Sequence, residues 1–199
     1  MSVRAAIDAF PSDLRPGDAV MLNDPFAGGT HLPDITVVMP VFVNTQARKP
    51  VLQGKEPRPD FYVASRAHHA DVGGTYPGSM GLCEEIYQEG VRIPPVKIMR
   101  GGTIERDVLA LLLNNVRTPQ EREGDLGAQI AACHAGAQRL REVCRRYSLP
   151  RVRRTMDDIQ DYADELMRAL LAKLPEGTFA AEGFLDDDGY GDQPVRIAV

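Results

Sequence analysis

The stretch HLPDITVVMPVFV, residues 31–43, decides the fold of the first half of this chain. From Ile35 to Val43 it is rich in β-branched residues, which favour strands, and Pro40 interrupts the run. Because proline donates no backbone hydrogen bond, we expect a strand with an edge or a bulge at that point. A second motif, FYVASRAHHADVGG at residues 61–74, begins with another short strand, Phe61 to Ser65, that leads directly to two histidines.

The remainder of the first half is short strands and loops. Residues 1–10 are predicted to form a short helix, because apolar side chains recur at helical spacing. Residues 19–22 are apolar and predict a buried strand, and residues 91–99 are predicted to be extended. Residues 44–59 are polar and contain three prolines, which indicates a surface loop.

Longer amphipathic segments dominate the second half. Helical periodicity predicts helices at residues 104–114, 119–147 and 155–174, and two strands flank an acidic turn at 186–192. The fold class is therefore α+β rather than a regular alternation of strands and helices. We expect a strand- and loop-rich region at 1–103 and a helical region at 104–199 that ends in a β-hairpin, together forming one compact unit.

Composition excludes several classes of protein. A net charge of −5 and a pI near 5.4 argue against nucleic-acid binding. No apolar run approaches the roughly 18 residues of a membrane span, and the N-terminus lacks the apolar core of a signal peptide. The three cysteines form no C-x-x-C pair, which suits a reducing compartment. We therefore expect a cytoplasmic protein.

Two clusters of histidine and aspartate carry the candidate chemistry. His31 and Asp34 precede one predicted strand, whereas His68, His69 and Asp71 follow another. Imidazole nitrogens and carboxylate oxygens suit Zn, Mn, Fe or a similar divalent ion. Because glycines flank both clusters, the backbone can approach a ligand closely there. Polar loop residues that only satisfy local hydrogen bonds are the alternative.

The paired histidines cannot both face the same site if the segment is extended, because neighbouring side chains alternate. We expect His69 to bind the metal with His31, Asp34 and Asp71, although His68 is not excluded as the ligand. The histidine that is not a ligand is a candidate for proton transfer near neutral pH. Asp24 either forms a turn or orients a ligand histidine without itself binding the metal.

Long stretches of the sequence resemble the hydantoinase B family. This family includes the B subunit of N-methylhydantoinase, the C-terminal part of 5-oxoprolinase, and the α-type subunits of acetone and acetophenone carboxylases. The resemblance covers nearly the whole chain, and its motifs are Gly17-Asp18, Asn23-Asp24-Pro25-Phe26, residues 28–34, residues 64–74, Pro77-Gly78-Ser79-Met80, Glu89-Gly90-Val91, Gly124-Asp125-Leu126 with Gln129, residues 174–178 and residues 186–189.

The resemblance implies an ATP-dependent hydrolase that opens small cyclic amides. Such a chain would be the metal-binding part of a hetero-oligomer, and an ATP-binding A-type subunit would activate the substrate. The family's metal-site pattern maps onto His31, Asp34, His68 or His69, and Asp71. No Walker motif is present in the sequence, which agrees with ATP binding by a separate partner.

Two departures from the family pattern leave alternatives open. Family members are much longer, with Met1 aligning inside them, and residues 45–59 look like an altered loop. We therefore expect a fragment that is inactive when isolated. The alternatives are a carboxylase-type α subunit, which shares the metal motif, and a truncated remnant without catalytic activity.

Overall fold

The computed structural model of the chain describes residues 1–43, 58–186, 191 and 193–199. These residues form two compact units, Met1–Arg146 and Tyr147–Val199. The division falls at residue 146 rather than at residue 103, where the sequence changes character, because helices beyond residue 103 pack onto the sheet of the first unit. The loop expected at 44–59 lies outside the described residues, except for its last two positions.

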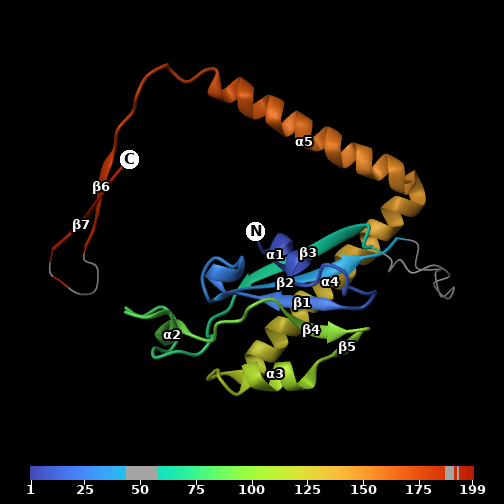
Figure 1. The fold of residues 1–199 in the computed structure, drawn as a ribbon, viewed down its shortest axis with the longest axis horizontal. Helices are drawn as coiled ribbons and strands as arrows, with labels where there is room; N and C mark the ends of the chain where they lie inside the picture. Colours follow the sequence, from blue (N-terminus) through green and yellow to red (C-terminus); the bar gives the residue numbers. More distant parts are fainter. Residues whose placement is uncertain (44–57, 187–190, 192) are drawn as a thin grey trace. The chain divides into compact units, whose positions relative to one another are not determined.

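Five antiparallel strands form the sheet of the first unit (Figure 1). Their order across the sheet is β3-β2-β1-β4-β5, and each strand pairs only with its neighbours in that order. The strands are β1 (Ala19–Leu22), β2 (Asp34–Val41), β3 (Phe61–His68), β4 (Val96–Arg100) and β5 (Thr103–Ile104). Strand β3 therefore lies at one edge, and both histidine-bearing segments meet at the β2–β3 pair.

Both faces of the central strands are covered, which explains their uninterrupted apolar sequence. On one face, Met21 and Val37 belong to a core cluster that includes Leu126 and Ile130 of α4 (Pro119–Tyr147). On the other face, the apolar residues that alternate with these along β1 and β2 pack with Ala6 of α1 (Ser2–Ala9). Because alternate side chains of a strand point to opposite faces, one short strand contributes to both cores.

Pro40 lies at a local edge of the sheet, one of the two arrangements that the sequence predicted for it. It pairs in register with Tyr62 on β3. On the other side, the pairing of β2 with β1 runs only from Leu22↔Thr36 to Val20↔Val38. Pro40 therefore lies where β2 has one neighbouring strand, and the hydrogen bond that proline cannot donate is not needed there.

Short helices complete the first unit. The 3-10 helix η1 (Pro25–Ala27) lies between β1 and β2, and α2 (Ile86–Glu89) precedes β4. Helix α3 (Arg106–Leu113) contributes the buried Leu112 to the same core as α4. The helices predicted at 1–10, 104–114 and 119–147 and the strands predicted at 19–22, 35–43 and 61–65 are confirmed to within about three residues at their ends, whereas the segment predicted to be extended at 91–99 forms a strand only from Val96.

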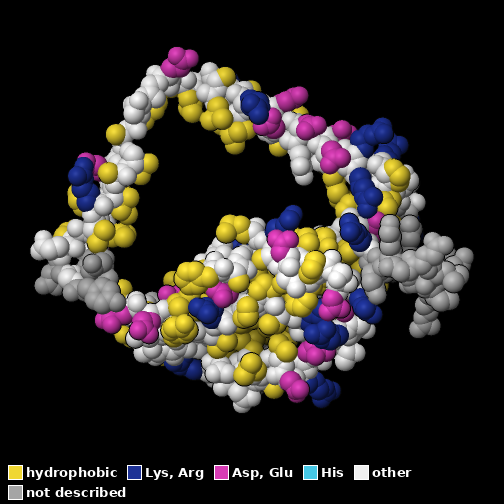
Figure 2. All heavy atoms as spheres, viewed as in Figure 1, with side chains coloured by type: hydrophobic (Ala, Val, Ile, Leu, Met, Phe, Trp, Pro, Cys, Tyr) yellow, Lys and Arg dark blue, Asp and Glu magenta, His cyan; other side chains and the backbone are white. Residues whose placement is uncertain are grey.

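The second unit contains α5 (Leu149–Leu171) and a hairpin of β6 (Glu182–Leu185) and β7 (Val195–Ala198). The expected start at Thr155 was wrong, because Pro150 stands in the first turn, a position that favours helix initiation. Large apolar side chains follow one side of α5 and are exposed, among them Ile159, Leu166 and Leu170 (Figure 2). No helix in the described ranges has the length and apolar character that crossing a bilayer requires. The α+β class with a terminal hairpin is confirmed.

A buried ion pair joins the start of the sheet to β4. Nζ of Lys97 lies 2.8 Å from Oδ2 of Asp18, and the two side chains are 2% and 4% exposed. Asp18 also accepts hydrogen bonds from the backbone N–H groups of Arg15 and Gly101. Removing Asp18 would leave the buried Lys97 ammonium with only Asp13, whose carboxylate is exposed, as its partner, which is strongly destabilising.

We therefore expect Asp18→Ala to lower the free energy of unfolding by about 3–5 kcal/mol, measured by urea denaturation. Asp13→Ala is the matched control, because Asp13 contacts the same Lys97 amino group at 3.0 Å through a carboxylate that is 54% exposed. The control should unfold close to wild type, since water screens that ion pair. Equal midpoints for Asp18→Ala and wild type would show that the Lys97–Asp18 pair does not support the sheet.

Candidate metal centre

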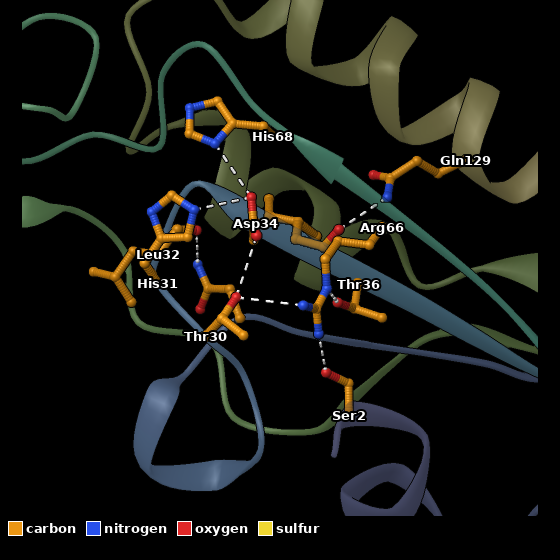
Figure 3. Close-up of polar contacts among 11 residues, drawn as sticks. Ser2, Thr30, His31, Leu32, Asp34, Thr36, Arg66, His68 and Gln129 are labelled. Atoms are coloured by element: carbon orange, nitrogen blue, oxygen red, sulfur yellow. Dashed lines mark hydrogen bonds and ion pairs between the residues drawn. The ribbon is translucent and has the colours of Figure 1, made fainter. Parts of the chain in front are cut away.

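Three side chains converge where β2 begins and β3 ends (Figure 3). Asp34 lies directly opposite His68 in the strand register, and His31 belongs to the loop that enters β2. Oδ1 of Asp34 lies 3.0 Å from Nε2 of His31 and 3.2 Å from Nδ1 of His68. One ligand atom from each residue fits within a mutual separation of 4.8 Å, and we call these three residues the triad.

The second oxygen of Asp34 accepts a hydrogen bond from a hydroxyl group, which in turn contacts a guanidinium group. Oγ1 of Thr30 donates to Oδ2 of Asp34 at 3.2 Å. Arg66 in turn donates to Thr30 at 3.5 Å, to Oγ1 of Thr36 at 2.9 Å and to Oγ of Ser2 at 2.6 Å. Figure 3 shows this chain of contacts running from the triad to the N-terminal helix. It leaves Oδ1 of Asp34 directed at the two imidazoles.

The electrostatic environment keeps Asp34 ionised. Burial acts to raise the pKa of the Asp34 carboxyl, but hydrogen bonds from His68, His31 and Thr30 and the charge of His31 outweigh it. The net result is a pKa below the usual value for aspartate. A carboxylate that stays charged between two imidazoles is suited to bind a cation.

A buried asparagine shapes the loop that carries His31. Asn23 is fully buried, and its Nδ2 donates to the carbonyls of Leu32 at 2.7 Å and Val91 at 2.9 Å. Its Oδ1 accepts from the N–H of Ile93 at 2.7 Å. A Cβ on Gly29 would lie 2.0 Å from the Asn23 carbonyl oxygen, so only glycine allows this close approach. The loop geometry thus fixes where His31 can lie.

His69 does not join the triad. It is 1% exposed, and its Nε2 lies 2.9 Å from Oε1 of Gln129 on α4. The amide nitrogen of Gln129 donates to the carbonyls of Ile35 and Ser65, so its oxygen must accept from His69, whose Nε2 carries the proton. Burial lowers the pKa of His69 despite the bond to Gln129, which favours the neutral imidazole.

Asp71 is likewise directed away from the triad. Its Oδ2 accepts from the backbone N–H of Arg117 at 2.6 Å, and its Oδ1 lies 3.0 Å from Nη1 of the same arginine. The N–H of Gly73 donates to Oδ1 as well. Arg117 also donates to the carbonyl of Gly74, so this pair organises the glycine-rich loop after β3. Of the four ligands expected, the structure joins His31 and Asp34 and adds His68.

Asp24 acts as a turn former. It caps η1 by accepting from the N–H of Phe26 at 2.9 Å, and its carboxylate pairs with Arg92 at 3.3 Å. The alternative, in which Asp24 orients a ligand histidine, has no contact in its support among the described residues. His134, the fourth histidine of the sequence, is exposed on α4.

The triad has the composition of a catalytic metal site. Two imidazoles and one carboxylate are the ligands that Zn or Fe takes in sites where other coordination positions are left open. The side chains of His31, Asp34 and His68 are 42%, 21% and 52% exposed, so the centre faces solvent and could admit a small molecule. The residues present therefore fit a divalent transition ion.

A family model described as hydantoinase B/oxoprolinase matches residues 1–199. The chain belongs to this family. The resemblance stated from the sequence is confirmed, and the triad lies within two of the motifs that carried it.

Two relatives show the range of the family. The caprolactamase subunit beta of Pseudomonas jessenii is 36% identical over 183 residues, covering 92% of this chain and 29% of that protein. The 5-oxoprolinase of Saccharomyces cerevisiae is 35% identical over 200 residues, covering 93% of this chain and 15% of that protein. The chain thus spans less than a third of the length of either relative.

Solved structures agree with this assignment. The ATP-dependent caprolactamase of Pseudomonas jessenii matches with a TM-score of 0.77 at 35% identity, covering 92% of this chain and 29% of that chain. A nucleotide-free acetone carboxylase matches with a TM-score of 0.59 at 25% identity, covering 73% of this chain and 18% of that chain. The fold of this chain therefore occurs in a caprolactamase and in an acetone carboxylase.

Sequence reasoning missed three residues that position this centre. Asn23, Arg66 and Gln129 all lie inside motifs that resemble the family, but their partners are 9 to 94 residues away in the chain. A polar residue within an otherwise buried helix face, as Gln129 is on α4, was the one signal available. Such a side chain needs partners from another element.

Gln129→Met should lower the free energy of unfolding by about 2 kcal/mol or more, because His69 and two strand carbonyls lose their partner in the interior. Gln120→Met on the exposed side of α4 is the control and should be neutral. Chemical denaturation followed by circular dichroism measures both. Wild-type stability in Gln129→Met would contradict the role assigned to this amide.

Proposed function

We propose that this chain is the metal-binding part of an ATP-dependent cyclic amidase of the hydantoinase B type. His31, Asp34 and His68 would hold one divalent transition ion, Zn, Mn or Fe. The observation that carries the proposal is the convergence of two imidazoles on one oxygen of an ionised carboxylate. Of the two adjacent histidines, the geometry favours His68 as the ligand.

The residues around the triad would prepare it for an ion. Thr30, itself contacted by Arg66, would hold Oδ2 of Asp34 so that Oδ1 faces both histidines before any ion binds. Such partners behind a ligand orient it and typically change metal affinity by about 10–100-fold. When bound, the ion would supply a Lewis acid that polarises a carbonyl or activates water.

His69 is a candidate for a supporting role. With 1% of its surface exposed and its Nε2 bound to Gln129, it can reach a substrate only through another group. Its Nδ1 is buried and has no hydrogen-bond partner among the described residues. We propose that His69 anchors the end of β3. A role of His69 in proton transfer is a separate hypothesis, which kinetic measurements on His69 variants would test.

ATP would be bound by a separate A-type subunit. The sequence contains no phosphate-binding loop of the Walker type. The solved caprolactamase of Pseudomonas jessenii is described as ATP-dependent, and the caprolactamase relative from the same organism is a subunit beta. Caprolactam and 5-oxoproline are both cyclic amides, which makes a small cyclic amide the proposed substrate class.

A carboxylase subunit is the second candidate. It is favoured by the structural match to acetone carboxylase at a TM-score of 0.59. The cyclic amidase is the first choice, because the match to caprolactamase covers more of the chain at higher identity. ATP hydrolysis that requires a ketone and bicarbonate instead of a cyclic amide would favour the carboxylase.

Metal content tests the triad directly. The purified chain should bind one equivalent of Zn, Mn or Fe, measured by plasma mass spectrometry after dialysis. His31→Ala and Asp34→Asn should each lose most of this metal, because each removes one of three ligands. Thr30→Val should weaken binding about tenfold or more, and Thr30→Ser should restore it.

Two control variants test whether the loss of metal is specific to residues of the triad. Asp71→Asn should keep the metal, because its carboxylate is occupied by Arg117, although the variant should be less stable. His134→Ala should match wild type in both respects, since His134 lies exposed on α4. Full metal content in His31→Ala and Asp34→Asn, or metal loss in Asp71→Asn alone, would refute the triad.

Catalysis should depend on the partner. Alone, the chain should hydrolyse no ATP. Co-expressed with an A-type ATP-binding subunit, it should couple ATP hydrolysis to the opening of 5-oxoproline or a hydantoin, and His68→Ala should abolish that coupling. The measurement is phosphate release together with product detection by chromatography. ATP hydrolysis by the chain alone, or unchanged coupling in His68→Ala, would contradict this assignment.

A further inference from the structure

One face of the β2–β3 pair carries both the triad and helix α1. Three successive pairs of the register share this face: Val38↔Ala64, Thr36↔Arg66 and Asp34↔His68. They share it because every second residue of a strand points to the same side. The first pair lies in the core that includes Ala6 of α1, and the last pair belongs to the triad. Arg66 therefore stands between α1 and the proposed metal centre.

The guanidinium of Arg66 contacts hydroxyls from three different segments (Figure 3). Nε donates to Thr36 on β2 at 2.9 Å, Nη1 to Thr30 at 3.5 Å and Nη2 to Ser2 on α1 at 2.6 Å. A guanidinium holds its donors in a fixed planar arrangement, unlike the flexible ammonium of lysine. Arg66 thus sets the position of Ser2 relative to Thr30, the residue that donates to Oδ2 of Asp34.

Helix α1 also contacts the loop that carries His31. Oγ of Ser2 donates to the carbonyl of Gly28 at 2.8 Å, and the Ser2 residue is 4% exposed. Gly28 has a φ of +96°, and a Cβ there would lie 2.4 Å from Cβ of Ala5. Helix α1 therefore lies directly against this loop, in a space that only glycine leaves open. One hydroxyl, that of Ser2, joins α1 to the loop of His31 and, through Arg66, to Thr30.

We propose that α1 positions the triad, and that Ser2 and Arg66 are the positioning residues that connect the helix to Asp34 and to the loop of His31. This inference rests on the proposed function for the bound ion and adds a control of its affinity. Elements of a fold can open locally at a lower free energy than global unfolding requires. Undocking of α1 would release Thr30 and the loop, so the three ligands would lose their fixed geometry. Because linkage is reciprocal, an ion at the triad would hold α1 on the sheet by the same factor.

Zn affinity, measured by calorimetric titration of the purified chain, tests the two positioning residues. Ser2→Ala should weaken binding about fivefold or more and Arg66→Lys about tenfold or more, although neither residue would bind the ion. Ser2→Thr keeps the hydroxyl and should retain most of the affinity. The double variant should weaken binding less than the product of the two single effects, because both residues act through the same contacts. Arg4→Gln is the control, since it breaks an exposed ion pair with Asp8 on the same helix and should bind Zn as wild type does.

Hydrogen exchange of α1 tests the reverse direction of this coupling. In wild type, saturating Zn should slow the exchange of the amides of residues 5–9 by about fivefold or more. In Ser2→Ala and in Arg66→Lys this Zn-dependent protection should largely disappear. A merely structural role of the two residues would lower stability and leave the Zn-dependent difference intact.

The metal-free chain separates this inference from the proposed function. Without metal and at one pH, the imidazole ¹⁵N signals of His31 and His68 should move in Ser2→Ala and stay in place in Arg4→Gln. Moved signals in a chain that takes up no Zn would support the positioning role and remove the metal centre. Wild-type Zn affinity in both Ser2→Ala and Arg66→Lys, or unchanged Zn-dependent protection in them, would overturn the inference and leave the metal centre in place. Unmoved signals would overturn the inference whether or not Zn binds.

Discussion

The register of β2 against β3 is the constraint on which the site depends, because it places Asp34 opposite His68. A slip by one residue would turn every side chain of β3 to the other face of the sheet. Two contacts oppose such a slip. The N–H of His69 continues the strand pairing by donating to the carbonyl of Pro33 at 2.8 Å. Gln129 of α4 ties the carbonyls of Ile35 and Ser65 together from the core side.

The same strand end explains why two adjacent histidines differ. Neighbouring residues of an extended segment point in opposite directions, so only one of the pair can face Asp34. His68 is in the triad, whereas His69 enters the interior, where burial lowers its pKa and Gln129 fixes its proton. The sequence predicted that the pair would divide its roles. The register, which depends on packing across the sheet, decides which histidine takes which role.

Prediction from sequence succeeded where the signal is local and long. Helix α4 was expected at residues 119–147 and is observed at Pro119–Tyr147, because its periodicity extends over many turns. The start of α5 was misplaced, since Pro150 initiates the helix before Thr155. The supports of the triad could not be found this way, because Arg66 contacts Ser2, 64 residues away, and Gln129 contacts Ile35, 94 residues away.

The contacts of Asp34 and Asp71 decide which of these two aspartates is free to bind a cation. In sequence, Asp34 and Asp71 look equivalent, since each lies within three residues of a histidine in a glycine-rich segment. In the structure, Asp71 is satisfied by the backbone and guanidinium of Arg117 and by Gly73, so a cation there would have to compete with an existing positive charge. Asp34 keeps one oxygen that meets only imidazoles. The position of the counter-charge therefore makes Asp34 the better candidate ligand and leaves Asp71 to hold the loop.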